Sequence, residues 1–361
     1  MRDLQIFQVE ITNRIFTSQR RTAHEKCLPL HALRVRPAGH GAKPNNNDTQ
    51  HPLMMKSSRL KGFLYGLATS VTFGLIPLFT LPLMQRGLTS DSILFYRFVA
   101  ATVALGTMMV VKGESFRIAW RDVPLLVVMA LFYTASSMFL LYGYEVMGAG
   151  VATTLHFTYP IFTTLLMLML FREGASWVTW LAIVLAVAGV ARLSLQGTEL
   201  TLDAWGVVVV LLSAVGYASY IVSVNKSRLR EMHSRKLAFY VFLFTALTFT
   251  VKNGVQGSFQ PLPDWGSVGL VVLLAVMPTV ISNITLLLAV RHIGGTLTSI
   301  LGALEPVTAV VIGACVFGEA FTAREATGIV LILAAVVLVI LTSRIKEGVE
   351  TVMKRIRPRH A

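Results

Sequence analysis

Long runs of hydrophobic residues separated by short polar loops dominate this sequence beyond residue 60. Ten such runs can be marked, each close to the ~20 residues that an α-helix needs to cross a lipid bilayer. None shows the alternation of polar and apolar residues that a transmembrane β-strand requires. The pattern predicts an all-α integral membrane protein with ten transmembrane helices, over 61–84, 92–111, 123–145, 149–171, 176–195, 204–225, 236–253, 266–290, 296–317 and 324–343.

Positive charge in the loops predicts how these helices are oriented. With the N-terminus in the cytoplasm, the inner loops and ends hold 19 Lys and Arg residues. The outer loops hold only Arg86, Arg192, Lys252 and Arg324. Loops rich in Lys and Arg stay on the cytoplasmic side of a membrane. We therefore expect both termini to be cytoplasmic, and a bacterial inner or plasma membrane as the location.

The composition agrees with a membrane protein and argues against other classes. Of the 361 residues, 54% are hydrophobic and 14% charged, whereas soluble domains carry about a quarter charged residues. The net charge of +14 lies in short loops, without an aromatic-interleaved basic surface, so we expect no nucleic-acid partner. Cys27 and Cys315 give no disulfide or metal spacing. No G-x-x-x-x-G-K-[ST] loop for ATP occurs, and we expect no metal or cofactor.

The two ends of the chain differ from the apolar part. Residues 1–54 have neither a helical apolar period nor the hydrophobic core of a signal peptide. We interpret them as a disordered cytosolic tail or a mis-assigned N-terminal extension, because Met55 begins a short basic lead into the first helix. Residues 344–361 are predicted to be a basic cytoplasmic tail.

The apolar part consists of two related halves. A shift of 146 residues places Tyr159-Pro160 on Glu305-Pro306, and Glu173 on Glu319. We divide the chain into a first repeat over 55–200, with helices 1–5, and a second over 201–343, with helices 6–10. Since five is odd, the second repeat enters the membrane from the opposite side. Such inverted repeats are typical of secondary transporters.

Short motifs recur in the two halves. The second half contains Ala303-Leu304-Glu305-Pro306-Val307, Phe317-Gly318-Glu319, Thr322 and Gly328, and the first half contains Tyr96-Arg97-Phe98, Tyr159-Pro160, Glu173 and Ser176. With these motifs the second half resembles the EamA-type domain of the drug/metabolite transporter superfamily, and the first half carries weaker copies. The resemblance covers about 58–343. The departure is Arg172, which stands where glycine is usual before the glutamate.

The resemblance implies a ten-helix permease that moves small organic solutes, often outward. Its central cavity would be lined mainly by helices 1, 3, 4, 6, 8 and 9. Substrates in the superfamily include amino acids, nucleotide-related compounds and sugars. On this basis Phe73, Tyr217 and Tyr220 are candidate cavity walls; as an aromatic stripe alone they would be core.

Four polar residues are expected at one depth in the membrane. From the ~1.5 Å rise per helical residue, Glu305, His156, Tyr159 and Asn283 lie roughly 10–15 Å from the faces at which their helices enter. Pro160 and Pro306 mark matched helix breaks in the two repeats, which point to a transport site. We therefore assign these four residues to substrate binding.

Each of these residues has a structural alternative. Glu305 is either a hydrogen-bonded packing residue or a site for protons or a substrate amine. His156 is either bonded to a neighbouring helix or a proton relay that titrates near neutrality. Tyr159 is the repeat counterpart of Glu305 or a spacer beside Pro160, and Asn283 is a packing or a cavity group.

Arg97 and Glu145 form a second kind of candidate site. Both are expected near the outer face, where an ion pair between them would act as a structural tie or an outer gate. Snorkelling of Arg97 to the surface is the alternative.

The sequence thus indicates a secondary transporter rather than an enzyme, working by alternating access on a small metabolite such as an amino acid. Its expected partners are that solute, the lipid bilayer and protons as a coupling ion. A second copy of the chain, in a homodimer, is a further partner that the sequence allows. A flippase for lipid-linked sugars is the main alternative. A membrane-embedded transferase would need clustered Asp or His, which the loops lack, and a channel would need a filter sequence or charged ring.

Overall fold

The computed structural model describes residues 50–147, 149–173, 175–194, 204–308, 311, 323 and 326–338. All regular structure in these ranges is helical, which confirms the predicted all-α class. Six helical segments are long and apolar enough to cross a membrane: Arg59–Gln85, Ser90–Val111, Trp120–Met147, Ala204–Lys226, Ser234–Gln256 and Trp265–Ile293. Shorter apolar helices cover Tyr159–Phe171, Trp177–Arg192 and Ala326–Leu338.

Most segments coincide with the runs marked in the sequence, but several consist of two helices. In chain order the elements are α2 (Gln50–Phe73), α3 (Ile76–Gln85), α4 (Ser90–Val111), η1 (Trp120–Asp122), α5 (Val123–Met147), α6 (Ala149–His156), α7 (Tyr159–Phe171), α8 (Trp177–Ser194), α9 (Ala204–Lys226), η2 (Arg228–Glu231), α10 (Ser234–Gln256), α11 (Trp265–Ala275), the π-helical η3 (Val276–Ile281), α12 (Ser282–Ile293) and α13 (Gly295–Leu301).

Local chemistry explains several helix ends. The Thr89 side chain caps α4 by accepting from Ser92 N at 3.4 Å, and Asp264 caps α11 by accepting from Ser267 N at 2.7 Å. Four helical segments begin with or next to a highly exposed tryptophan. Tryptophan is enriched where a helix enters the membrane interface. The four are Trp120, Trp177, Trp205 and Trp265.

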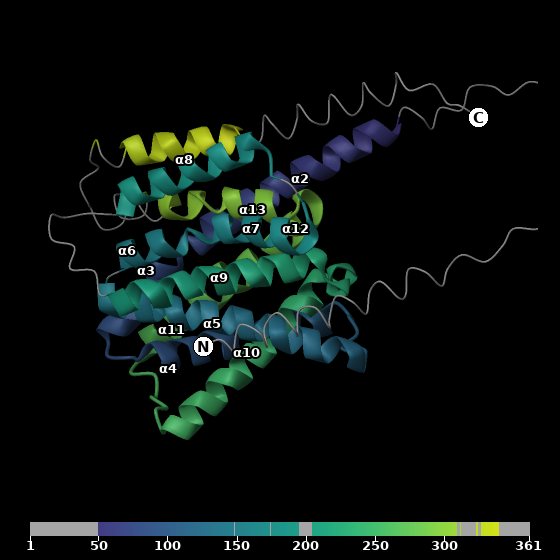
Figure 1. Ribbon diagram of the computed structural model, residues 1–361. Coiled ribbons are helices and arrows are strands. Elements are labelled where there is room, and N and C mark those ends of the chain that lie inside the picture. Colours follow the sequence, from purple (N-terminus) through teal and green to yellow (C-terminus); the bar gives the residue numbers. More distant parts are fainter. Residues whose placement is uncertain are drawn as a thin grey trace, which may run out of the picture. The chain divides into compact units, whose positions relative to one another are not determined.

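Helix α9 lies in the middle of the bundle, between α5 and α7 (Figure 1). Its Gly216 permits close approach to α5, because a Cβ there would lie 3.0 Å from Phe132 O. Helices α4 and α10 pack through fully buried aromatic rings, with Phe98 stacked on Phe249 at 6.0 Å between centroids. Buried aromatic pairs of this kind stabilise beyond their area.

Helix α2 packs closely on α12 and α13 through two glycines one turn apart. A Cβ on Gly62 would lie 2.6 Å from Ile293, and one on Gly66 2.5 Å from Leu301. Small residues at this spacing let helix backbones approach inside a membrane. These contacts hold α2 beside the segment that carries Glu305.

Four of the predicted continuous helices are interrupted, and a proline lies at or just after each interruption. The fourth predicted run divides at Phe157-Thr158, before Pro160, and the ninth at Gly302-Ala303, before Pro306. The first run divides at Gly74-Leu75 and the eighth contains η3. Proline lacks the N–H that continues a helix and clashes with the preceding turn. Hydrophobicity alone could not reveal these breaks.

Several sequence interpretations lie outside the described residues. They include nearly all of the segment 1–54, the tail 344–361 and the second copy of the motif beyond Pro306, with Cys315, Phe317, Glu319 and Thr322.

Candidate functional site

The aromatic residues predicted at the site come together around Tyr217 of α9. Its ring centroid lies 4.8 Å from that of Tyr159, 5.6 Å from His156 and 6.1 Å from Phe73. Tyr220, one turn further along α9, stacks on Tyr217 at 6.4 Å. Four segments therefore meet here: the end of α2, the end of α6, the start of α7 and the middle of α9.

The matched breaks of the two repeats are in direct contact. The Tyr159 hydroxyl occupies the space where a side chain on Gly302 would lie. The break after α13 leaves Leu301 O without its usual helical partner, because Glu305 N bonds Gly302 O at 2.8 Å instead. Ser70 of α2 supplies a hydroxyl at 2.9 Å from Leu301 O. A buried carbonyl that would cost free energy is thereby satisfied.

Glu305 lies just after this break, partly accessible, with its backbone against Gly74. Tyr133, Tyr144, Tyr159 and Tyr217 are all close enough to feel its charge. Among the residues that the structure describes, no hydrogen bond or ion pair engages its carboxyl group. Within the described part of the chain, the carboxyl group thus lies near several tyrosines and has no hydrogen-bonding or ionic partner, as a site for a proton or a cation requires.

His156 is fixed by hydrogen bonds from helices α9 and α5. Its Nδ1 lies 2.9 Å from Ser213 Oγ, and Ser213 Oγ donates to Ser136 O at 2.7 Å. Since the Ser213 hydroxyl donates its one hydrogen to Ser136 O, it can only accept from His156, so Nδ1 carries the hydrogen of the first bond. In the neutral ring Nε2 is then the acceptor. His156 is thus bonded to a neighbouring helix, and among the described residues Nε2 has no hydrogen bond.

Asn283 joins the cluster through Tyr220, whose hydroxyl donates to Asn283 Oδ1 at 3.0 Å. The side-chain nitrogen of Asn283 is buried and has no hydrogen-bond partner. Tyr133 lies beside the same amide and packs on Tyr220 at 5.0 Å. A buried donor without an acceptor costs about 1–3 kcal/mol, so this amide is poised for a ligand or a water molecule.

Arg97 and Glu145 do not pair with each other, contrary to the sequence prediction. Arg97 is only 3% exposed, and its Nε donates to Thr279 Oγ1 at 2.7 Å inside the bundle. Glu145 is exposed and accepts from Ser90 Oγ at 2.5 Å. The depth estimate ignored that a long side chain can turn inward, so the two groups point to different partners. Arg97 does not snorkel to the surface either.

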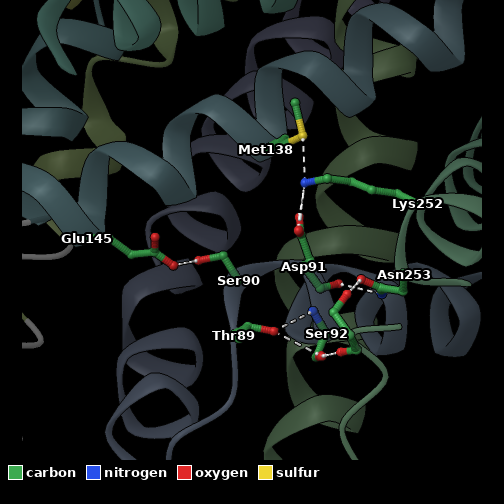
Figure 2. A network of polar contacts seen from close by, with 9 residues as sticks. Thr89, Ser90, Asp91, Ser92, Met138, Glu145, Lys252 and Asn253 are labelled. Atoms are coloured by element: carbon green, nitrogen blue, oxygen red, sulfur yellow. Dashed lines mark hydrogen bonds and ion pairs between the residues drawn. The ribbon is translucent and has the colours of Figure 1, made fainter. Parts of the chain in front are cut away.

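A polar network at the start of α4, near the Ser90–Glu145 contact, joins α4 to α10 and α5. Figure 2 shows Lys252 Nζ bound to both carboxylate oxygens of Asp91 at 2.6 Å and lying 3.4 Å from Met138 Sδ. Asn253 Nδ2 donates to Asp91 O at 3.3 Å. This ion pair, which the sequence analysis missed, ties the start of α4 to the last turn of α10.

A second group of ion pairs lies at the other ends of α4 and α10 and at the end of α9. Glu114, after α4, pairs with Arg235 in the first turn of α10, and His233 lies 3.7 Å from its other oxygen. The hydrogen bond from Arg235 lowers the pKa of Glu114 below its ordinary value. Lys226 at the end of α9 pairs with Glu173.

Thr279, Ser213 and Tyr133 support the site but were not predicted. Ser213 precedes Tyr217 and Tyr220 by four and seven residues, a helical spacing that places it on their face. Thr279 follows Pro278 directly, and its hydroxyl donates at 2.7 Å to Leu274 O, the carbonyl that Pro278 leaves unpaired. In the described ranges no group of three or more His, Cys, Asp or Glu side chains is arranged to hold a metal ion.

These features define the class: a multi-pass helical membrane protein whose broken helices surround a buried polar cluster. The sequence profile of the EamA-like transporter family matches residues 60–195 and 204–341, one copy in each half. The chain belongs to this family, and it is a membrane transporter with two EamA domains.

Relatives in other organisms are named as transporters. The uncharacterized transporter YdfC of Bacillus subtilis is 24% identical over 244 residues, covering 65% of this chain and 76% of the relative. The uncharacterized inner membrane transporter YedA of Escherichia coli K12 is 24% identical over 268 residues, covering 72% of this chain and 82% of the relative. A solved crystal structure, 18% identical, shares the fold with a TM-score of 0.66 over 78% of this chain and 98% of that one.

Proposed function

We propose that this transporter moves a small organic metabolite such as an amino acid, bound in the cluster around Tyr217. One observation carries the proposal: residues from four interrupted or central segments converge where the two repeats' breaks meet, at Tyr159 and Gly302. Matched breaks in repeated halves are where secondary transporters bind their substrates. Phe73, Tyr217 and Tyr220 supply apolar walls, and His156, Asn283 and Glu305 supply the polar contacts.

In this proposal Glu305 takes up either a proton or the amine of the substrate. A carboxyl group near several tyrosines that lacks a cationic partner among the described residues favours such a role over packing. His156 assists through its open Nε2, while Ser213 keeps the ring oriented. The proton supplied by the membrane gradient is then the coupling ion.

The transport cycle we propose is alternating access between two inverted five-helix repeats. Ten helices with both termini in the cytoplasm would give that arrangement, and the bias of Lys and Arg between the two sets of loops supports it. The Asp91–Lys252 tie at one end and the Glu114–Arg235 tie at the other are the contacts that would open in turn.

A thermal-shift screen of the purified full chain tests this function. The ligands are amino acids, nucleosides, sugars and lipid-linked sugars, each at two pH values. A ligand present at ~100 times its Kd stabilises the folded state by about 2.7 kcal/mol. A soluble metabolite that stabilises the protein, and loses this effect on Tyr217→Ala, supports the proposal. A response confined to lipid-linked sugars would contradict it and favour a flippase.

A further inference from the structure

We propose that Arg97 and Asn283 form a carboxylate-binding end of the transport site, so that the transported solute carries a carboxylate group. This inference rests on the solute site proposed above and narrows its substrate class. It assigns a binding role to an arginine for which the sequence predicted a structural tie or an outer gate with Glu145, or snorkelling to the surface.

The first observation is that Arg97 carries a buried charge without a counter-ion. In the described part of the chain, no Asp or Glu side chain forms an ion pair with it. Its bonds are from Nε to Thr279 Oγ1 at 2.7 Å and from Nη2 to Pro278 O at 3.5 Å. A guanidinium has five N–H donors, so three N–H groups of Arg97 make no hydrogen bond to the described residues. A buried, uncompensated charge is strongly unfavourable, and a membrane protein keeps one for a function.

A purely structural role for Arg97 is not needed to repair the break at Pro278. Thr279 Oγ1 already donates to Leu274 O at 2.7 Å, the carbonyl that lacks its helical partner. Ser282 Oγ donates to Pro278 O at 2.6 Å. The backbone of η3 is therefore satisfied by its own side chains, and the weak bond from Arg97 to Pro278 O adds little.

The second observation is the free amide of Asn283. Its Oδ1 is held by Tyr220 at 3.0 Å, which leaves the buried Nδ2 as a donor without an acceptor. Asn283 follows Thr279, the residue that anchors Arg97, by four positions, and Tyr133 lies near both Arg97 and Asn283. We infer that one carboxylate accepts from Arg97 and from Asn283 with its two oxygens.

The third observation is the polarity of the cluster. The Tyr133 ring packs 5.8 Å from that of Phe98, which lies under the Arg97 guanidinium, and 5.0 Å from that of Tyr220. Tyr133 also lies near Glu305, so a fixed cation and a carboxyl group are both close to this ring. A solute with a carboxylate for Arg97 and an ammonium for Glu305 matches this arrangement, which is the chemistry of an amino acid.

Paired ligands test the proposal directly. Binding of the 20 protein amino acids and of their carboxamides to the full chain in nanodiscs is measured for wild type, Arg97→Gln, Asn283→Ala and the control Arg121→Gln, at an exposed residue of η1. We expect at least one amino acid to bind wild type about 100-fold more tightly than its amide. Arg97→Gln should remove that difference, Asn283→Ala should reduce it, and Arg121→Gln should preserve it.

Three results would overturn the carboxylate site. One is equal affinity for an acid and its amide in wild type. Another is an equal loss of both ligands in Arg97→Gln. The third is binding of only uncharged solutes such as nucleosides, which would leave the proposed transport function intact. Inorganic phosphate and chloride are included as probes, and stabilisation by these alone would identify an anion site unrelated to an organic solute. Absence of any soluble ligand would instead contradict the transport function itself.

The unfolding temperature of Arg97→Gln without ligand distinguishes loss of the binding site from misfolding of the variant. Because removal of an uncompensated buried charge relieves its desolvation cost, Arg97→Gln should unfold at a temperature equal to or higher than wild type. A structural arginine would give a lower unfolding temperature together with loss of all ligands, and that combination also contradicts the proposal.

Discussion

The hydroxyl of Tyr159 fills the space above Gly302, so that the break in one repeat packs directly on the break in the other. Gly302 has an ordinary helical backbone, with φ −53°. Glycine is needed at this position because the Tyr159 hydroxyl leaves no room for a side chain, whereas the backbone conformation would allow any residue. Any side chain on Gly302 must push Tyr159 out of the aromatic cluster.

The first prediction follows from this contact. Gly302→Ala should destabilise the protein by about 1–3 kcal/mol, the usual cost of forcing an extra carbon into a packed interior. It should also weaken ligand binding, because Tyr159 moves. Thermal unfolding in detergent measures the first effect and ligand-induced stabilisation the second.

A double variant provides the control for steric overlap. Tyr159→Phe removes the hydroxyl that lies nearest to the added methyl group, so Gly302→Ala should cost less in that background. Equal cost in both backgrounds would show that Gly302 serves some purpose other than making room for Tyr159.

The second prediction concerns the serine that orients His156. Ser213→Ala should leave the buried Nδ1–H unpaired and cost about 1–3 kcal/mol. Ser219→Ala on the same helix is the matched control, because Ser219 bonds only the carbonyl of its own helix at Val215 O. That control should change stability by less than about 0.5 kcal/mol. Similar effects of the two substitutions would argue against the assigned network.

The third prediction concerns the Asp91–Lys252 ion pair, whose side chains are 22% and 32% exposed. Asp91→Lys alone places two like charges together, and Lys252→Asp does the same with two acids. Each should lower stability by about 1 kcal/mol or more, since a half-buried pair lies between surface and buried cases. The double charge swap should recover most of the loss. Failure to recover would mean that other contacts in Figure 2 hold α4 to α10.

The fourth prediction is a pH dependence at Glu114. Arg235 lowers the pKa of this carboxyl in the folded protein. The pair therefore stabilises the fold fully above the unfolded-state pKa of about 4.3, and the contribution is lost as pH falls through the lowered folded-state pKa. The difference in unfolding temperature between wild type and Glu114→Gln should be present at pH 7 to pH 8 and should shrink below about pH 4. A difference unchanged at low pH would contradict the pairing.

Sequence reasoning predicted the helical class and located most of the cluster, for physical reasons that can be stated. Polar residues such as His156, Asn283 and Glu305 stand out in apolar runs because hydrocarbon penalises them. The fixed rise of a helix predicts a common depth for these residues, and in the structure His156 contacts Tyr159 while Asn283 bonds Tyr220 of the same aromatic cluster. The prolines at 160 and 306 marked where regular backbone ends.

The remaining features depend on side-chain direction and on contacts distant in sequence. Arg97 was placed near the outer face by counting residues, but its side chain runs inward to Thr279, 182 positions away. The Asp91–Lys252 pair joins residues 161 positions apart. No local pattern specifies such partners, because each charge has several possible neighbours until the bundle is packed. The π-helical form of η3 was likewise hidden within a uniform apolar run.

Counterflow in proteoliposomes tests the central claim most directly. Vesicles that contain the full chain and an excess of an unlabelled ligand from the thermal-shift screen are mixed with trace radiolabelled ligand. We predict transient accumulation by wild type and by Glu231→Gln, a control at an exposed residue of η2. Glu305→Gln should abolish accumulation or remove its dependence on pH. Accumulation by Glu305→Gln with an unchanged pH profile would contradict a transport site at the junction of the two repeats.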